Sequence, residues 1–188
     1  MMRLFYVVLI AFCAIAGAVY AVEPVDHIVV RGVSWGASQE EVSRNRNVSR
    51  SRDSLDLTDL LVEKDFIGLV PVSVEYGFFK NKLYAITIES ATEAAAGGLD
   101  SVFLEWKNML IEKYGAYSSE GRNPDSGPFY FHTLSWRESG VTPGMALESN
   151  VLNGKAIVVR IRYLDPTVYF HVEELGKLKF MEDQKKKF

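Results

Sequence analysis

Residues 70–89 read VPVSVEYGFFKNKLYAITIE, and this stretch decides the fold class. Apolar side chains alternate with small or polar ones on both sides of a central Lys-Asn-Lys: Val70, Val72, Val74, Tyr76 and Phe78 before it, and Tyr84, Ile86 and Ile88 after it. A period of two residues is typical of a strand that buries one face. Two such strands with a short turn between them predict an antiparallel β-hairpin.

The length of the turn decides which side chains of the hairpin share a face. A two-residue loop would place Thr87 and Glu89 beside the apolar residues of the first strand, because a slip of one residue turns every side chain to the other face. A three-residue loop, Lys80–Lys82, keeps the two apolar sets together, so we predict this loop. The opposite face is then expected to meet solvent, with Ser73, Glu75, Gly77, Thr87 and Glu89.

The same alternation predicts four further strands, near residues 58–65, 129–137, 145–152 and 156–164. An odd loop around Asn153-Gly154 puts the apolar residues of the last two strands on one face: Met145, Leu147, Val151, Ile157, Val159, Ile161 and Tyr163. Their other face then carries Glu148, Asn150, Arg160 and Arg162.

Two helices are predicted from caps and from apolar residues at helical spacing. Ser38 followed by Glu41 is a capping box, in which each side chain satisfies a backbone donor at the start of a helix near 38–46. A second helix is expected over residues 100–114, where one stripe carries Phe103, Trp106, Leu110 and Tyr114.

A third helix is expected after Asp165 and Pro166, which suit the first positions of a helix. Its inward side is predicted to hold Val168, Val172, Leu175 and Leu178. The alternative is that residues 167–172 form another strand.

These elements together predict an α+β fold in the order helix–βββ, helix–βββ, helix. We expect two layers, an antiparallel sheet with the helices on one face, built as a pseudo-repeat of a helix-βββ unit. The mature chain is expected to be a single α+β domain, residues 22–188, with halves of about 30–90 and 99–188.

Residues 1–21 predict a secretory signal peptide. A positive start is followed by the apolar run Leu4–Ala16 and by small residues before a cleavage site after Ala21. The alternative is an uncleaved anchor helix. The single cysteine, Cys13, follows Phe12 where a lipoprotein signal has a small residue, so lipidation is not expected. We therefore expect a periplasmic or secreted bacterial protein with no transmembrane segment after cleavage.

The composition limits the partners and the chemistry. The 188 residues carry 21 Lys+Arg and 24 Asp+Glu, a formal net charge of −3. Nucleic-acid binding normally needs a strongly basic face, so no nucleic-acid partner is predicted. On the predicted helices, only His171 has a carboxylate, Glu174, at the spacing of a local metal-ligand pair, and a metal site needs at least three ligands. No nucleophile or phosphate-loop motif occurs, so we predict no catalytic, cofactor or metal site and no enzyme.

Two charged surfaces are the candidates for binding. The first is the polar sheet face, with Glu75, Glu148, Arg160 and Arg162. The second is the basic segment with Arg44, Arg46, Arg50 and Arg52, which suits an acidic partner or anionic lipid. The alternatives are cross-strand ion pairs in the first case and a solvated helix end and loop in the second.

Three motifs carry a resemblance to exported bacterial proteins: WGASQEEV at 35–42, VEYGFFKNKLY at 74–84 and KYG at 113–115. The layout is similar to the helix-then-sheet unit of the small lipoprotein of the outer-membrane barrel-assembly machinery, and to the tandem units of β-lactamase inhibitor proteins. The resemblance implies a helix-plus-three-strand fold. This chain differs from the first in lacking an acceptable lipobox, and from the second in lacking cysteines after residue 21. No functional residue carries over.

We predict an exported, non-enzymatic binding or assembly module whose partner is another protein or an envelope component. The polar sheet face or a loop at 118–128 would carry the contact. The alternative is a small-ligand or lipid-binding periplasmic protein, which needs an apolar pocket of at least about 300 Å³. A hydrolase would need His132 or His171 to converge with two carboxylates in a cleft.

Overall fold

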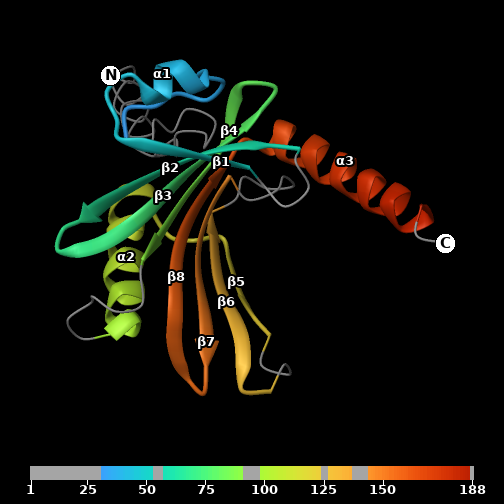
Figure 1. Ribbon diagram of the computed structural model, residues 1–188. Coiled ribbons are helices and arrows are strands. Elements are labelled where there is room, and N and C mark those ends of the chain that lie inside the picture. The colour runs from blue at the N-terminus through green and yellow to red at the C-terminus, as the bar shows by residue number, and fades with distance from the viewer. Residues whose placement is uncertain (1–30, 53–56, 91–97, 124–126, 137–143, 187–188) are drawn as a thin grey trace, which may run out of the picture.

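A computed structural model describes residues 31–52, 57–90, 98–123, 127–136 and 144–186, so the predicted signal peptide lies outside the described residues. In the described residues one antiparallel sheet dominates, with 47% strand and 31% helix. The elements in chain order are α1 (Gln39–Ser43), β1 (Val48–Arg52), β2 (Asp59–Ile67), β3 (Val70–Phe79), β4 (Lys82–Ser90), α2 (Gly98–Tyr114), β5 (Ser119–Arg122), β6 (Phe129–Trp136), β7 (Met145–Leu152), β8 (Lys155–Leu164) and α3 (Pro166–Lys185) (Figure 1).

The eight strands lie in the order β1-β2-β3-β4-β8-β7-β6-β5, and every neighbouring pair is antiparallel. Each half of the chain therefore starts at one edge of the sheet and proceeds to its centre. The two halves join where β4 pairs with β8, from Ala85 opposite Leu164 to Ser90 opposite Val159.

The predicted helix-βββ pseudo-repeat is wrong, because each half adds four strands to one continuous sheet. The two strands that the sequence did not reveal are the edges, β1 and β5. Their sequences, VSRSR and SEGR, lack the alternation of a half-buried strand, and they are held by backbone pairing to β2 and β6. The basic segment 44–52 and the predicted loop at 118–128 are thus partly strand.

Both long hairpins have a turn that differs in length from the predicted one. Lys80 and Asn81 form a two-residue turn, with φ of 50° and 60°, as a type I′ turn requires. A register shift after Gly77 then adds one residue to β4 and places Ile86 opposite Tyr76. The β7–β8 hairpin has the same combination of a two-residue turn, at 153–154, and a register shift, after Asn150.

The odd loops are wrong. Ile86 and Ile88 share the predicted face with the apolar residues of β3, but Tyr84 is the extra residue at the shift and lies against Gly77 on the other face, while Leu83 is buried in the core. Ile157 is the extra residue of β8, and Ala156 packs against the core in its place.

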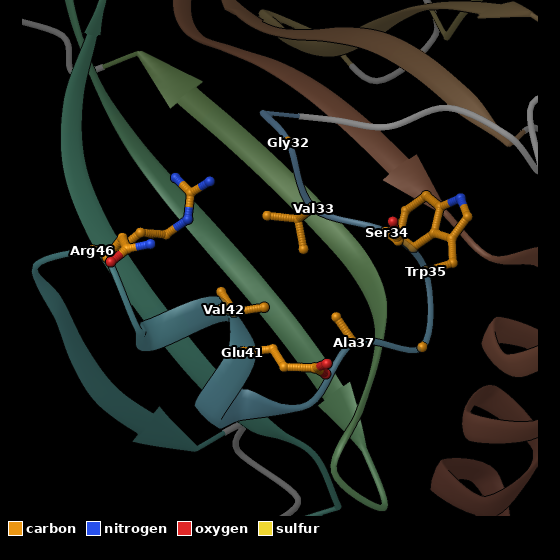
Figure 2. Close-up of a pocket in the computed structure, with 10 residues that line it drawn as sticks. Gly32, Val33, Ser34, Trp35, Ala37, Glu41, Val42 and Arg46 are labelled. Atoms are coloured by element: carbon orange, nitrogen blue, oxygen red, sulfur yellow. The ribbon is translucent and has the colours of Figure 1, made fainter.

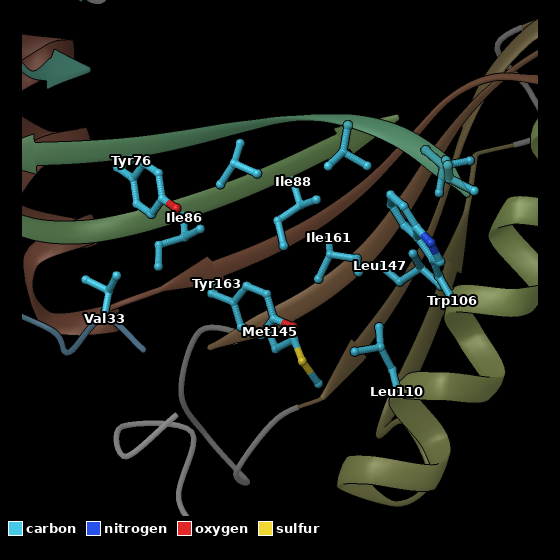
Figure 3. Close-up of a cluster of buried hydrophobic side chains, with 14 of the residues drawn as sticks. Val33, Tyr76, Ile86, Ile88, Trp106, Leu110, Met145, Leu147, Ile161 and Tyr163 are labelled. Carbon is cyan, nitrogen blue, oxygen red and sulfur yellow. The ribbon is translucent and has the colours of Figure 1, made fainter. Parts of the chain in front are cut away.

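The core lies between the sheet and α2. Leu99, Val102, Trp106 and Leu110 are the buried residues of this helix. Trp106 and Leu110 point toward Leu147 and Ile161 of β7 and β8 (Figure 3). The predicted stripe is therefore correct at its centre.

The last helix is confirmed, and its predicted packing is wrong. Asp165 caps α3 by accepting hydrogen bonds from the amides of Thr167 and Val168, so 167–172 is helical. None of its described side chains is buried, and Leu178 is 54% exposed, because α3 extends away from the sheet (Figure 1). No helix in the described ranges is long and apolar enough to cross a membrane.

The placement of helices on one face is also wrong. Arg162 lies on the sheet face opposite α2, since its neighbour Ile161 packs in the core. The His171 ring of α3 packs against Phe79, with centroids 5.6 Å apart, and Phe79 lies on this same face because its neighbour Phe78 is in the core. The start of α3 therefore sits at the face that α2 leaves uncovered.

The capping box of α1 gives a first prediction. The Ser38 hydroxyl accepts from the Glu41 amide at 3.2 Å, and the Glu41 carboxylate accepts from the Ser38 amide at 2.7 Å. Ser38→Ala should lower the free energy of unfolding by about 1 kcal/mol, because a five-residue helix depends on its cap. Urea unfolding followed by Trp fluorescence measures it. Glu40→Gln, at an exposed position of the same turn, should change stability by less than about 0.5 kcal/mol. Equal effects would contradict the role of the cap.

Candidate functional site

The sheet face opposite α2, called here the far face, carries the first predicted surface. On strands β4, β8 and β7 it presents Thr87, Glu89, Arg160, Arg162 and Glu148. Register places Arg160 directly between Glu89 on one neighbouring strand and Glu148 on the other. Three of the four predicted residues, Glu148, Arg160 and Arg162, are therefore brought together at the centre of the sheet.

These charges form two ion pairs. Arg160 Nε lies 2.5 Å from Glu89 Oε2, and Arg162 Nη1 lies 3.1 Å from Glu148 Oε1. The Arg162 site is partly desolvated, which disfavours its charge, but Glu148 nevertheless holds the pKa of the guanidinium above its ordinary value. The ion-pair alternative is thus correct for these residues. Glu89 is the partner that the candidate set omitted.

Glu75 does not join this cluster. It is exposed on β3, with Val62 and Thr87 as its cross-strand neighbours, and forms no ion pair with any residue in the described ranges. Strand β4 separates it from Arg160 and Arg162.

An aromatic pair lies at one end of the far face. Phe129 and Phe131 meet edge to face, with ring centroids 5.1 Å apart. Phe131 is 50% exposed, and Leu152, opposite Phe129 in the register, is 40% exposed. Large apolar side chains that stay exposed beside charged groups are typical of contact surfaces.

The basic segment divides into residues with different surroundings. Arg46 turns inward, where its guanidinium donates to the carbonyl of Arg31 at 2.5 Å and lies 3.4 Å from Glu63. Arg44 is exposed after α1, and Arg50 is exposed on β1. Arg52 ends β1, and its side chain lies outside the described part. The predicted solvated helix end is confirmed at Arg44, whereas the loop is wrong from Val48 onward, where β1 begins.

Glu63 is the centre of a charged network at the core side of β2. Its carboxylate accepts from the Tyr76 hydroxyl at 2.9 Å and lies 3.9 Å from Arg31, which also pairs with Asp65. Burial, followed by the hydrogen bond to Glu63, raises the pKa of Tyr76 to about 12. The Arg46 guanidinium lies over the same ring, 5.6 Å from its centroid.

A cavity of about 610 Å³ opens between the segment 32–37 and α1. Its lining includes Val33, Trp35, Val42, Glu41 and Arg46 (Figure 2). Both charged members already have partners, since Glu41 belongs to the capping box and Arg46 pairs with Glu63. The cavity is therefore more polar than a lipid site needs.

A second cavity, of about 520 Å³, lies beside the edge strand. It is lined by Gln39, Arg50, Ser51, Asp59 and Leu60. The Gln39 side-chain amide donates to Asp59 Oδ2 at 3.0 Å. The charge pattern of the sequence indicates Arg50, but Gln39 and Asp59 come next to it only through the pairing of the strands and the position of α1.

Within the part of the chain that the structure describes, His132 converges with one carboxylate, not with the two that a hydrolase would need. Its Nε2 lies 2.8 Å from Glu120 Oε1, and the Tyr117 hydroxyl donates to the other Glu120 oxygen at 3.1 Å. Its ring lies against Phe103 of α2, with centroids 4.8 Å apart. His171 instead meets the edge of Phe79 at 5.6 Å.

The surroundings of His132 predict a pH dependence. Burial against α2 lowers the pKa of His132 from 6.5, although Glu120 opposes this effect, and Arg122 and Lys107 add to the lowering. As the pH falls, His132 is therefore protonated in the unfolded chain at a higher pH than in the folded protein. Its contribution to the free energy of unfolding is complete above about pH 6.5 and is lost as the pH falls below that value. We expect the free energy of unfolding to decrease between about pH 7.5 and pH 5.5.

The variant His132→Phe keeps the ring against Phe103 and removes the titration. Its stability should vary less over the same pH range in urea unfolding experiments. A variant and parent with identical pH profiles would contradict this assignment. The lowered pKa of Glu120 acts in a separate, more acidic window, because an unperturbed carboxyl titrates near 4.5.

Among the described residues, no group of three or more His, Cys, Asp or Glu side chains is placed to hold a metal ion. Comparison with models of protein families, with curated proteins and with solved structures finds no match for this chain.

Proposed function

We propose that this protein is an exported, non-enzymatic binding module and that the far face docks another protein or envelope component. One observation carries the proposal: the exposed Phe131 and Leu152 continue into the ion pairs at the centre of a sheet face that α2 leaves uncovered.

The chemistry of the far face suits a protein partner. Aromatic side chains supply most of the binding free energy at protein interfaces, and surrounding polar groups exclude water and fix orientation. Phe131 would be the anchor. Arg160 and Arg162, whose charges are balanced by Glu89 and Glu148, would supply orientation and discrimination more than affinity.

Site-specific photo-cross-linking tests the proposal in the native compartment. A cross-linking residue at Thr133, on the far face opposite Glu148, should capture one specific component, whereas one at the exposed Asn108 of α2 should not. Phe131→Ser should abolish the capture, and Phe170→Ser should not. Phe170, 49% exposed on α3, is a matched control for Phe131. Equal capture at the two positions, or indifference to Phe131→Ser, would contradict the proposal.

The cavity of about 610 Å³ favours a small-ligand carrier as the second candidate, since it exceeds the size that a small-molecule site needs. Native mass spectrometry of the purified protein tests it. A retained small molecule that is lost in Ser34→Trp, a change at an exposed residue of the lining, would favour the carrier. If no fatty acid or short glycan binds to the protein on incubation, the result would favour the far face as the functional surface.

A further inference from the structure

We propose that the β1 edge binds an extended acidic peptide, which adds to the sheet as a further strand and places a carboxylate beside Arg50. This interaction is independent of the far face. It assigns a partner class to the basic segment, which the proposed function leaves unused.

The backbone of β1 has the geometry that strand addition needs. It is the outermost strand on its side of the described sheet, and it pairs with β2 through five consecutive residues without a register shift. An antiparallel edge strand directs every second pair of N–H and C=O groups away from its neighbour. The sequence VSRSR contains no proline, which would remove a donor.

The charge of this edge selects the chemistry of the partner. Arg50 is exposed and forms no ion pair with a described residue, and Arg44 is exposed at the end of α1 nearby in the chain. The opposite edge differs, since β5 has four residues and its charged side chains, Glu120 and Arg122, pair with each other at 3.2 Å. A guanidinium with no ion-pair partner in the described ranges favours a carboxylate, with which it can form two parallel hydrogen bonds.

The cavity of about 520 Å³ supplies the place for one side chain of the added strand. Arg50 lies on its wall, and the Asp59 carboxylate there is already bound by Gln39. An incoming carboxylate would therefore meet the guanidinium, while Asp59 keeps its own donor. Backbone pairing gives affinity and a side-chain pocket gives selectivity in this mode of recognition.

Fluorescence anisotropy with short synthetic peptides tests the proposal on the purified protein. The probe is a labelled peptide in which Glu alternates with Thr, and the comparison peptides carry Gln or Lys in place of Glu. The Glu peptide should bind at least about tenfold more tightly than the Gln peptide, and the Lys peptide should not bind. Arg50→Glu should weaken binding by about tenfold or more. Lys185→Glu makes the same change of net charge near the far end of α3 and should leave affinity unchanged.

Backbone methylation separates strand addition from simple charge attraction. Two forms of the Glu peptide, N-methylated at odd or at even positions, lose the amide donors on opposite edges of an extended strand. One form should lose binding and the other should retain it. Equal binding of both forms would overturn strand addition. Absence of binding by the Glu peptide, or equal binding by Glu and Lys peptides, would overturn the acidic partner.

Discussion

Glu63→Ala is expected to lower the free energy of unfolding by about 3 kcal/mol, because it leaves the Arg46 guanidinium and the Tyr76 hydroxyl without their shared acceptor. Tyr76 is fully buried, and the side chains of Glu63 and Arg46 are only 13% and 19% exposed. Removing one member of a pair buried to this extent costs much more than breaking a surface ion pair, whose contribution is about 0–1 kcal/mol.

Two variants divide the effect into its parts. Glu63→Gln keeps an acceptor for Tyr76 and loses the charge, so it should be less destabilising than Glu63→Ala. Tyr76→Phe removes one hydroxyl and should cost about 1 kcal/mol. Glu105→Gln, at an exposed position of α2, is the control and should change stability by less than about 0.5 kcal/mol in the same urea titration. A Glu63→Ala effect as small as that of Glu105→Gln would show that water solvates the network.

Trp106→Ala should be the most destabilising change in α2, with a loss of about 4 kcal/mol. Trp106 is 1% exposed and lies between the helix and strands β7 and β8 (Figure 3). Its indole N–H has no hydrogen-bond partner among the described residues. Trp106→Phe removes this unsatisfied donor while it keeps an aromatic ring in the core, so we expect a much smaller loss of about 1 kcal/mol.

Thermal and urea unfolding, followed by circular dichroism, measure both Trp106 variants. Leu104→Ala is the matched control on the same helix, since Leu104 is 56% exposed, and its effect should stay below about 0.5 kcal/mol. Equal losses for Trp106→Phe and Trp106→Ala would contradict the unsatisfied state of the indole N–H.

The apolar pattern and the caps of this sequence predict six strands, the three helices and most of the residues on the faces of both hairpins. They do not predict which turn length and strand register bring the apolar residues of two paired strands to the same face. Alternation requires Ile86 to share a side with Tyr76, and an odd loop or an even loop with a bulge satisfies this requirement equally well. Positive φ at Lys80 and Asn81 favours the second solution, and the preference of a lysine for that conformation is too weak to read from the sequence.

The edge strands and the ion pairs depend on contacts between residues far apart in the sequence, which the local pattern of apolar residues does not predict. β1 and β5 bury little, so backbone pairing alone defines them. The alternation of residues along the strand predicts that Arg160 and Arg162 lie on the polar face. Their partners Glu89 and Glu148 come from two different neighbouring strands. The contact between Glu120 and His132 likewise depends on the pairing of β5 with β6. Long-range pairing of this kind is decided by the whole sheet.

The seam between β4 and β8 sets the order in which the chain can fold. Strands β1 to β4 form a meander of neighbours in sequence, and so do β5 to β8. Each meander can form from local contacts, which close quickly. The seam pairs Ala85 with Leu164, so it must wait until the final strand is available. Until then, β4 is an open edge with apolar side chains beside it, and a chain that folds as it is synthesised passes through this aggregation-prone state before β8 is available.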